Sequence, residues 1–166
     1  MRVLGIDPGL RITGYGCVER APADRRGRRG VGPDAVLVEG GVIRLNAKTS
    51  VSARLAELDV DLAEIIARLE PDAVAVEKLY AHYKHPTTAI VMGHARGVVL
   101  LAIERAGLKL IELGATEVKK ALTGNGHASK DQMQRGVQHQ LGLAAPPKPA
   151  DVADAIAIGL CGLRRG

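Results

Sequence analysis

The order of apolar segments along the chain is the feature that most restricts its fold. Three segments rich in β-forming residues, separated by glycine-rich turns, predict a meander of strands at residues 2–7, 12–19 and 35–45. Helical and strand patterns then alternate, with strands expected at 73–77 and 108–113 and helices at 50–69, 87–106, 115–122, 129–141 and 150–163. This order predicts an α/β protein with a five-stranded mixed sheet and helices on both faces.

Two of the predicted strands end in a carboxylate. Asp7 follows the apolar run 3–6, and Glu77 follows the run 73–76, whose unbroken apolar character is typical of a parallel strand buried on both faces. In open α/β sheets, ligands gather beyond the carboxyl ends of the strands. If the first and fourth strands are parallel neighbours, Asp7 and Glu77 lie side by side.

Two more carboxylates, Asp151 and Asp154, open the last predicted helix and share one of its faces. Acids in such apolar surroundings are costly unless they are paired or hold a metal ion. Mg²⁺ is often held by one or two carboxylates, so four acids could hold two ions, an arrangement suited to in-line phosphoryl displacement. Two simpler interpretations stay open: Asp7 could start a turn, and Asp151 could be an acid favoured by the helix dipole.

The composition is compatible with a polyanionic partner. The 166 residues suffice for one domain, and they carry a net charge of +5 with an isoelectric point near 9.5. Five arginines lie between Arg20 and Arg29, and we expect residues 20–33 to form a solvated, flexible basic loop. No metal-ligand spacing involves the two cysteines, Cys17 and Cys161, which are expected to be buried and reduced in a cytoplasmic protein.

Aromatic residues are rare, which makes their placement informative. There is no Phe or Trp, and two of the three tyrosines, Tyr80 and Tyr83, follow Glu77 in a loop that also contains Lys84. Aromatic side chains interleaved with cations are typical of sites that hold unpaired bases. Lys119 and Lys130 flank a glycine-rich loop at 123–128, a setting that favours phosphate contacts.

The sequence predicts no membrane association. No uninterrupted apolar run approaches 18 residues, so no transmembrane helix is expected. The first apolar run stops after four residues, which indicates a strand and not a signal peptide.

A set of short motifs occurs in a fixed order along nearly the whole chain. The motifs are Leu4-Gly5-Ile6-Asp7-Pro8-Gly9, Thr13-Gly14-Tyr15-Gly16, Ala75-Val76-Glu77, Gly93-His94-Ala95-Arg96-Gly97, Glu117-Val118-Lys119-Lys120-Ala121, Thr123-Gly124-Asn125-Gly126, Ala128-Ser129-Lys130 and Ala150-Asp151-Val152-Ala153-Asp154-Ala155. Each motif is weak alone, but the ordered set resembles the RuvC family of bacterial crossover junction (Holliday junction) endodeoxyribonucleases.

The resemblance implies a single RNase H-like nuclease domain over residues 1–166 that acts as a homodimer. It implies Mg²⁺-dependent, paired and symmetrical nicking of four-way DNA junctions in recombination and repair, with Mn²⁺ as a possible substitute and the branch-migration proteins RuvA and RuvB as possible partners. By position, the family's metal-binding acids match Asp7, Glu77, Asp151 and Asp154. Tyr80 matches a base-stacking aromatic, Lys119 and Lys130 match basic DNA contacts, and the helix around Gly93–Gly97 matches the dimer interface.

Three other functions fit the sequence less well. An actin-like ATPase generally needs two Gly-Ile-Asp halves, and this chain has one. A related nuclease acting on ribosomal RNA precursors fits less well at Gly93–Gly97 and Thr123–Lys130, and a non-catalytic junction-binding protein has no need of all four acids.

Overall fold

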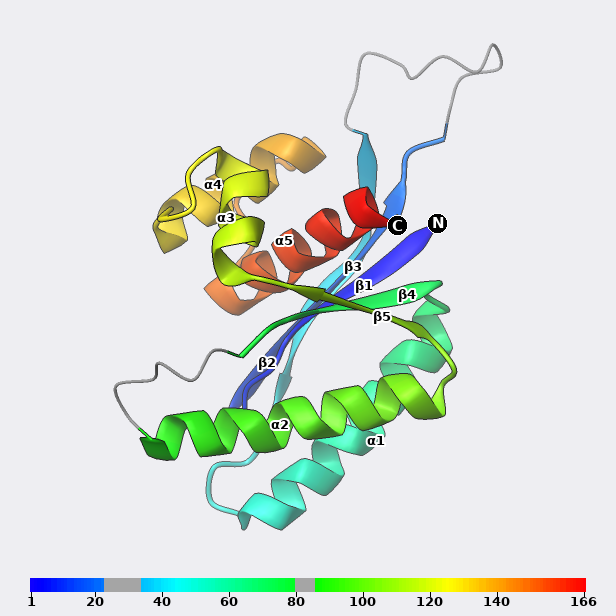
Figure 1. Ribbon diagram of the computed structural model, residues 1–166, viewed down its shortest axis with the longest axis vertical. Coiled ribbons are helices and arrows are strands. Elements are labelled where there is room, and N and C mark those ends of the chain that lie inside the picture. Colours follow the sequence, from blue (N-terminus) through cyan, green and yellow to red (C-terminus); the bar gives the residue numbers. More distant parts are fainter. Residues whose placement is uncertain (23–33, 80–85) are drawn as a thin grey trace.

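The computed structural model describes residues 1–22, 34–79 and 86–166 of the chain. Within these residues, five strands form one mixed sheet that lies between two layers of helices (Figure 1). The strands are β1 (Arg2–Asp7), β2 (Ile12–Arg20), β3 (Ala35–Arg44), β4 (Ala73–Glu77) and β5 (Lys109–Leu113). The helices are α1 (Val51–Leu69), α2 (Pro86–Arg105), α3 (Ala115–Thr123), α4 (Lys130–Leu141) and α5 (Ala150–Arg165).

The sheet has the order β3-β2-β1-β4-β5, which confirms the predicted mixed architecture. β1, β2 and β3 are antiparallel neighbours, as expected for a meander, whereas β4 runs parallel to both β1 and β5. Ile6 is the register partner of Val76. Asp7 and Glu77, the residues that follow this pair, therefore lie side by side at the carboxyl ends of β1 and β4.

Helices α1 and α2 cover one face of the sheet through large aliphatic side chains (Figure 1). The Ser50 hydroxyl caps α1 by accepting a hydrogen bond from the Ala53 amide at 3.1 Å. Leu58 and Leu62 are fully buried and share one core with Leu4 and Ile6 of β1. Burial of this periodic apolar stripe is what holds α1 against the sheet.

The opposite face is covered by α5, with α3 and α4 outside it (Figure 1). Glycines in the sheet allow α5 to approach the backbone closely. A Cβ on Gly5 would lie 2.1 Å from the carbonyl oxygen of Ala155, and one on Gly14 would lie 2.2 Å from that of Asp151. Any larger residue would push the helix away, so these glycines fix the depth at which the acids of α5 lie.

The predicted elements agree with the observed ones to within one or two residues at each end. The largest difference is at α5, which continues to Arg165 instead of ending near residue 163. Cys17 and Cys161 are buried and free, as predicted.

Helix α2 meets a length and composition criterion for a membrane span that the sequence was not expected to meet. Over Thr87–Arg105 its mean hydropathy is 1.3, and 22% of the stretch is buried. The expectation from the sequence rests on uninterrupted apolar runs, and His94 and Arg96 interrupt the run in this helix. The mean hydropathy of the whole stretch stays high in spite of these two residues. One such helix is weak evidence for membrane association.

Candidate active site

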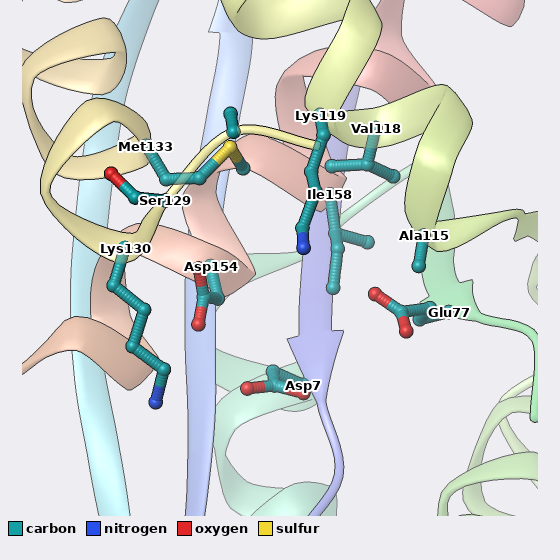
Figure 2. A pocket seen from close by; sticks show the side chains of 11 residues that line it. Asp7, Glu77, Ala115, Val118, Lys119, Ser129, Lys130, Met133, Asp154 and Ile158 are labelled. Carbon is teal, nitrogen blue, oxygen red and sulfur yellow. The ribbon is translucent and has the colours of Figure 1, made fainter. Parts of the chain in front are cut away.

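A pocket of about 430 Å³ lies beyond the carboxyl ends of β1 and β4. Three carboxylates from distant parts of the chain line it: Asp7 at the end of β1, Glu77 at the end of β4 and Asp154 on α5 (Figure 2). The structure thus brings together three of the four acids predicted from the sequence.

The position of Asp7 depends on the tight connection between β1 and β2. The fully buried Thr13 hydroxyl donates to the carbonyl of Gly9 at 2.7 Å and lies 3.1 Å from the Gly9 amide, which donates to it. Asp7 therefore does precede a turn, as the simpler interpretation held, but its side chain also lines the pocket. The two roles are compatible.

The position of Glu77 depends on Arg96 of α2. The Arg96 Nε donates to the backbone carbonyl of Glu77 at 3.3 Å, and its Nη2 pairs with the Glu112 carboxylate of β5. Only 15% of the Arg96 side chain is exposed, so this contact holds the end of β4 against α2 with little competition from water.

Asp154 lies in the second turn of α5, on the same side as Ile158, and both line the pocket. The close approach of α5 to Gly5 and Gly14 carries this carboxylate to the edge of the sheet. Its helix is otherwise buried along most of its length.

The three acids repel one another in a poorly solvated pocket. Burial, followed by the charges of Asp154, Glu77 and Asp151, raises the pKa of Asp7 to about 7. Burial also raises the pKa of Glu77 and the pKa of Asp154, with a further contribution from Asp154 to the first and from Asp151 to the second. A cation bound among these carboxylates would stabilise their ionised form.

Two lysines moderate this repulsion. Lys119 of α3 and Lys130, the first residue of α4, both line the pocket (Figure 2). Lys130 lowers the pKa of Asp7 and of Asp154, and Lys119 lowers the pKa of Glu77 and of Asp154. Two of the three lysines predicted to contact DNA, Lys119 and Lys130, therefore lie among the predicted metal ligands.

Asp151 is the exception among the four acids. It lies in the first turn of α5 and lines a neighbouring pocket, with Gly9 and Arg54, and not the pocket of the other three. Its charge nevertheless raises the pKa of both Asp7 and Asp154. Asp151 thus lies between the two pockets, and its assignment as a ligand stays a prediction.

The chemistry of the donor set fits a hard divalent cation, because all the converging atoms are carboxylate oxygens. The carboxylates form an open site that does not surround an ion on all sides. Among the described residues, no three His, Cys, Asp or Glu side chains are close enough to enclose an ion. Mg²⁺ usually keeps several of its water ligands, so an open arrangement of carboxylates suits it. Zn²⁺ is usually held by three or four protein ligands with His or Cys among them, and neither lines this pocket among the described residues.

Several predicted contacts lie outside the described residues, namely Tyr80, Tyr83, Lys84 and residues 23–33 of the basic loop. Conversely, sequence reasoning missed the roles of Arg96 and of Arg54 in forming the two pockets. Arg96 belongs to a motif that was assigned only to the dimer helix. No sequence signal indicated Arg54, because an arginine in the first turns of an amphipathic helix usually faces solvent.

Comparison with known proteins identifies the family. The profile described as "Crossover junction endodeoxyribonuclease RuvC" matches residues 3–162. A protein of that name from Rhodopirellula baltica is 47% identical over 160 residues, covering 96% of this chain and 84% of its own length. Another from Synechococcus sp. (strain WH7803) is 39% identical, covering 98% of this chain and 97% of its own.

Solved structures agree in fold and in sequence. The Thermus thermophilus RuvC structure superposes with a TM-score of 0.82 at 34% identity and covers 97% of this chain and 92% of its own. T. thermophilus RuvC in complex with a Holliday junction substrate gives a TM-score of 0.84 at 35% identity, with the same coverage. The yeast mitochondrial Holliday junction resolvase Ydc2, at 14% identity and a TM-score of 0.64, shares the fold alone. With its RNase H-like fold and a family match over nearly its whole length, this chain belongs to the RuvC family of crossover junction endodeoxyribonucleases.

Proposed function

We propose that this protein resolves four-way DNA junctions by paired, symmetrical nicks in recombination and repair. The observation that carries the proposal is the pocket itself. Carboxylates from β1, β4 and α5 converge beside two lysines, at the strand ends where α/β proteins bind ligands, in a chain of the RuvC family. The whole of residues 1–166 would serve as one nuclease domain in the cytoplasm.

Asp7, Glu77 and Asp154, with Asp151 beside them, would hold divalent cations. We propose Mg²⁺, two ions per pocket, with Mn²⁺ as a substitute. When bound, such ions activate an attacking water and neutralise charge on the leaving 3′ oxygen of a phosphodiester. The protein's own part is to keep these oxygens converging. Because the pKa of Asp7 is about 7, its ionisation, and with it the binding of a cation, would depend on pH near neutrality.

Lys119 and Lys130 would contact the phosphate under attack and its neighbour. Each ammonium group lies near the acids, and neither forms an ion pair with a carboxylate in the part of the chain that the structure describes. They are thus free to bind DNA. Tyr80, Tyr83 and Lys84 would contact bases and backbone at the crossover, a role that rests on the sequence alone.

Two nicks require two pockets, and the exposed face of α2 would join two copies of the chain. Ile90 and Leu101 are 60% and 46% exposed, although both are large apolar residues. Gly93 and Gly97 lie on the same side of the helix, and a Cβ on either would meet no described residue within 4 Å. An apolar face interrupted by glycines permits close contact with a second helix.

Cleavage of defined substrates tests the activity. The protein should cut a mobile four-way junction with Mg²⁺ or Mn²⁺ but not with a chelator, and should leave a flap and a linear duplex intact. Asp7→Asn and Glu77→Gln should bind the junction and fail to cut it, a loss of at least about 10³-fold. Cleavage at the normal rate by either variant would refute the site, and equal cleavage of all three substrates would refute the substrate.

Analytical ultracentrifugation tests the dimer. Ile90→Glu should shift the protein toward monomer, whereas Val60→Glu, on the exposed side of α1, should not, because Val60 is similarly exposed at 66% but lies on another helix. A wild-type protein that sediments as a monomer at all concentrations would contradict the interface.

The alternative functions receive no support from the comparisons, since the matching proteins are crossover junction endodeoxyribonucleases. RuvA and RuvB stay proposed partners, to be tested by binding measurements with purified proteins.

A further inference from the structure

A second pocket lies directly beside the catalytic one and is close to it in size, about 420 Å³. Three parts of the fold form its walls: the turn between β1 and β2, the beginnings of α1 and α2, and the first turn of α5. The residues that matter for its chemistry are Arg11, Arg54, Thr88 and Asp151. Apart from Asp151, the residues that line this pocket have no part in the proposed cleavage reaction.

Arg54 is incompletely satisfied. Its Nη1 donates to the carbonyl of Leu10 at 3.1 Å, but its Nε is buried and has no hydrogen-bond partner among the described residues. The Nη2 likewise has no acceptor within that part of the chain. A buried donor without an acceptor is costly, and the guanidinium group presents Nε and Nη2 along one edge, in the geometry that two oxygens of one phosphate can accept.

The surroundings also favour an anion. Arg11 adds a second guanidinium group to the lining. Arg54 and Thr88 lie near the N-terminal ends of α1 and α2, and the first turns of these helices contain no acidic residue that would repel an anion. Among the described residues, Asp151 is the one carboxylate that lines the pocket. It lies on the side shared with the catalytic acids, since its charge raises the pKa of Asp7 and Asp154. The pocket is thus cationic on the side away from the catalytic acids.

We propose that this pocket, defined by Arg54 and Arg11, binds a backbone phosphate of the DNA strand being cut, next to the scissile one. The inference rests on the proposed function. Asp7 lines the first pocket and Gly9, two residues later, lines the second. A strand with one phosphate at the acids would therefore have a neighbouring phosphate within reach of the arginines. The site would fix the position of the strand along its own axis and so help to choose which bond is cut.

The test combines salt dependence with chemical modification of the DNA, both measured as junction binding in chelator. Each phosphate contact contributes about 0.9 to the slope of log Kd against log salt concentration. Arg54→Gln should weaken binding about tenfold and reduce the slope by about one. Arg105→Gln is the matched control, because Arg105 is an exposed arginine of α2, paired with Asp59, outside both pockets. It should change neither quantity.

A series of junctions with a single neutral methylphosphonate identifies the phosphate. At one position beside the cleavage site, the substitution should weaken binding to the wild type but add nothing to the effect of Arg54→Gln. Should Arg54→Gln unfold the protein, Arg11→Gln, at an exposed residue, answers the same question.

An unchanged salt slope for both variants, in a wild type that cuts junctions, would overturn this inference and leave the proposed function intact. A wild type that cuts no junction would instead overturn the function. If inorganic phosphate raised the melting temperature through Arg54 while no methylphosphonate position mattered, the pocket would hold a free anion and the proposal would be wrong.

Discussion

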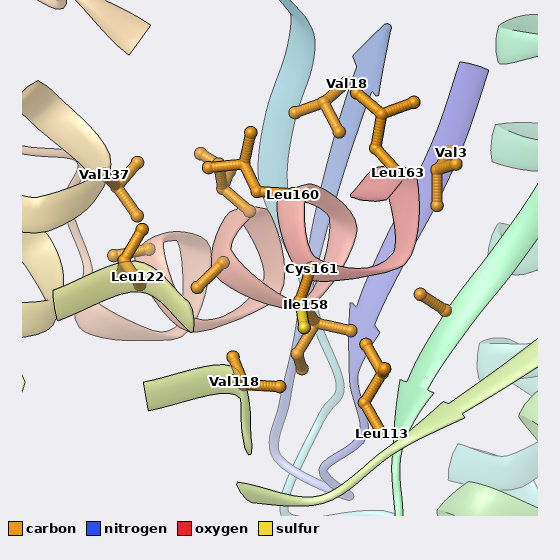
Figure 3. Close-up of a cluster of buried hydrophobic side chains, with 14 of the residues drawn as sticks. Val3, Val18, Leu113, Val118, Leu122, Val137, Ile158, Leu160, Cys161 and Leu163 are labelled. Carbon is orange, nitrogen blue, oxygen red and sulfur yellow. The ribbon is translucent and has the colours of Figure 1, made fainter. Parts of the chain in front are cut away.

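The two faces of the sheet hold their helices in different ways. On the α1 and α2 face, long aliphatic side chains such as Leu58 and Leu62 interdigitate with those of β1. On the α5 face, aliphatic residues such as Ile158 and Leu160 fill the space around the helix, but at its centre backbone meets backbone across glycines (Figure 3). The first kind of contact can repack after a substitution, whereas the second cannot.

The difference matters because the candidate site depends on the face that cannot repack. Asp7 and Glu77 belong to the sheet, and Asp154 belongs to α5. Their mutual distance is therefore set by how deeply α5 lies on β1 and β2. Changes on the α1 and α2 face should alter stability, and changes at the glycines should alter both stability and chemistry.

Gly5→Ala should have the largest combined effect. Its new methyl carbon would lie 2.1 Å from the Ala155 carbonyl oxygen, so α5 must move outward. We expect a loss of about 3 kcal/mol or more in the free energy of unfolding, and about 100-fold slower cleavage by the folded protein. Urea denaturation and single-turnover cleavage check both. Normal cleavage would show that the depth of α5 does not control the site.

Leu62→Ala, on the opposite face, is the matched comparison. Removal of a fully buried leucine side chain should lower the free energy of unfolding by about 3 kcal/mol through lost burial and the cavity left behind. Cleavage per folded molecule should not change. If activity fell as much as it does in Gly5→Ala, the proposed difference between the two faces would be wrong.

Asp7→Asn should stabilise the metal-free protein at high pH. The pKa of Asp7 is about 7 in the folded protein and 3.8 as an isolated group, so the folded state binds the proton more tightly. The contribution of Asp7 to stability therefore falls as pH rises between these two values. At pH 8 in chelator, the variant should gain about 2 kcal/mol, less than the full shift implies because a buried amide also needs partners.

The same comparison at pH 4 should show little difference. Asp7 is then protonated in the folded state and still about half protonated in the unfolded state, so its raised pKa has cost little stability. Thermal denaturation across this pH range measures the effect. If the gain in stability did not depend on pH, it would come from packing and not from the removed charge.

Glu70→Gly should have the smallest effect and the opposite sign to the two core substitutions. Glu70 ends α1 with φ of 45°, a left-handed conformation that glycine adopts without strain. The variant should gain about 0.5–1 kcal/mol in the free energy of unfolding, with cleavage unchanged. Chemical denaturation is the measurement, and a loss of stability would show that the Glu70 side chain contributes contacts of its own.

Much of the fold was predictable because local signals agree with the tertiary structure. Ser50 and Ser129, at which two of the helices were predicted to begin, cap those helices. Asp7 and Glu77 lie together because the runs before them form parallel neighbours. Asp154 was predictable as well, since a lone acid on a buried helix face needs an explanation.

The second pocket could not be predicted in this way. Arg54 and Arg11 are separated in sequence and acquire a common surrounding only when α1, α2 and the β1–β2 turn pack together. An arginine with unused donors has no signature in its neighbours along the chain. The same holds for Arg96, whose bond to the Glu77 carbonyl joins a helix to a strand end.

The contact between Gly5 and Ala155 joins the first strand to the last helix. Contacts between residues so far apart in the sequence raise the contact order of a fold, which slows folding. During synthesis, Asp7 emerges from the ribosome first of the three acids. It can lie beside Asp154 only after all the residues between them have been synthesised. A nascent chain that has not yet reached Asp154 therefore lacks one of the three acids that line the pocket.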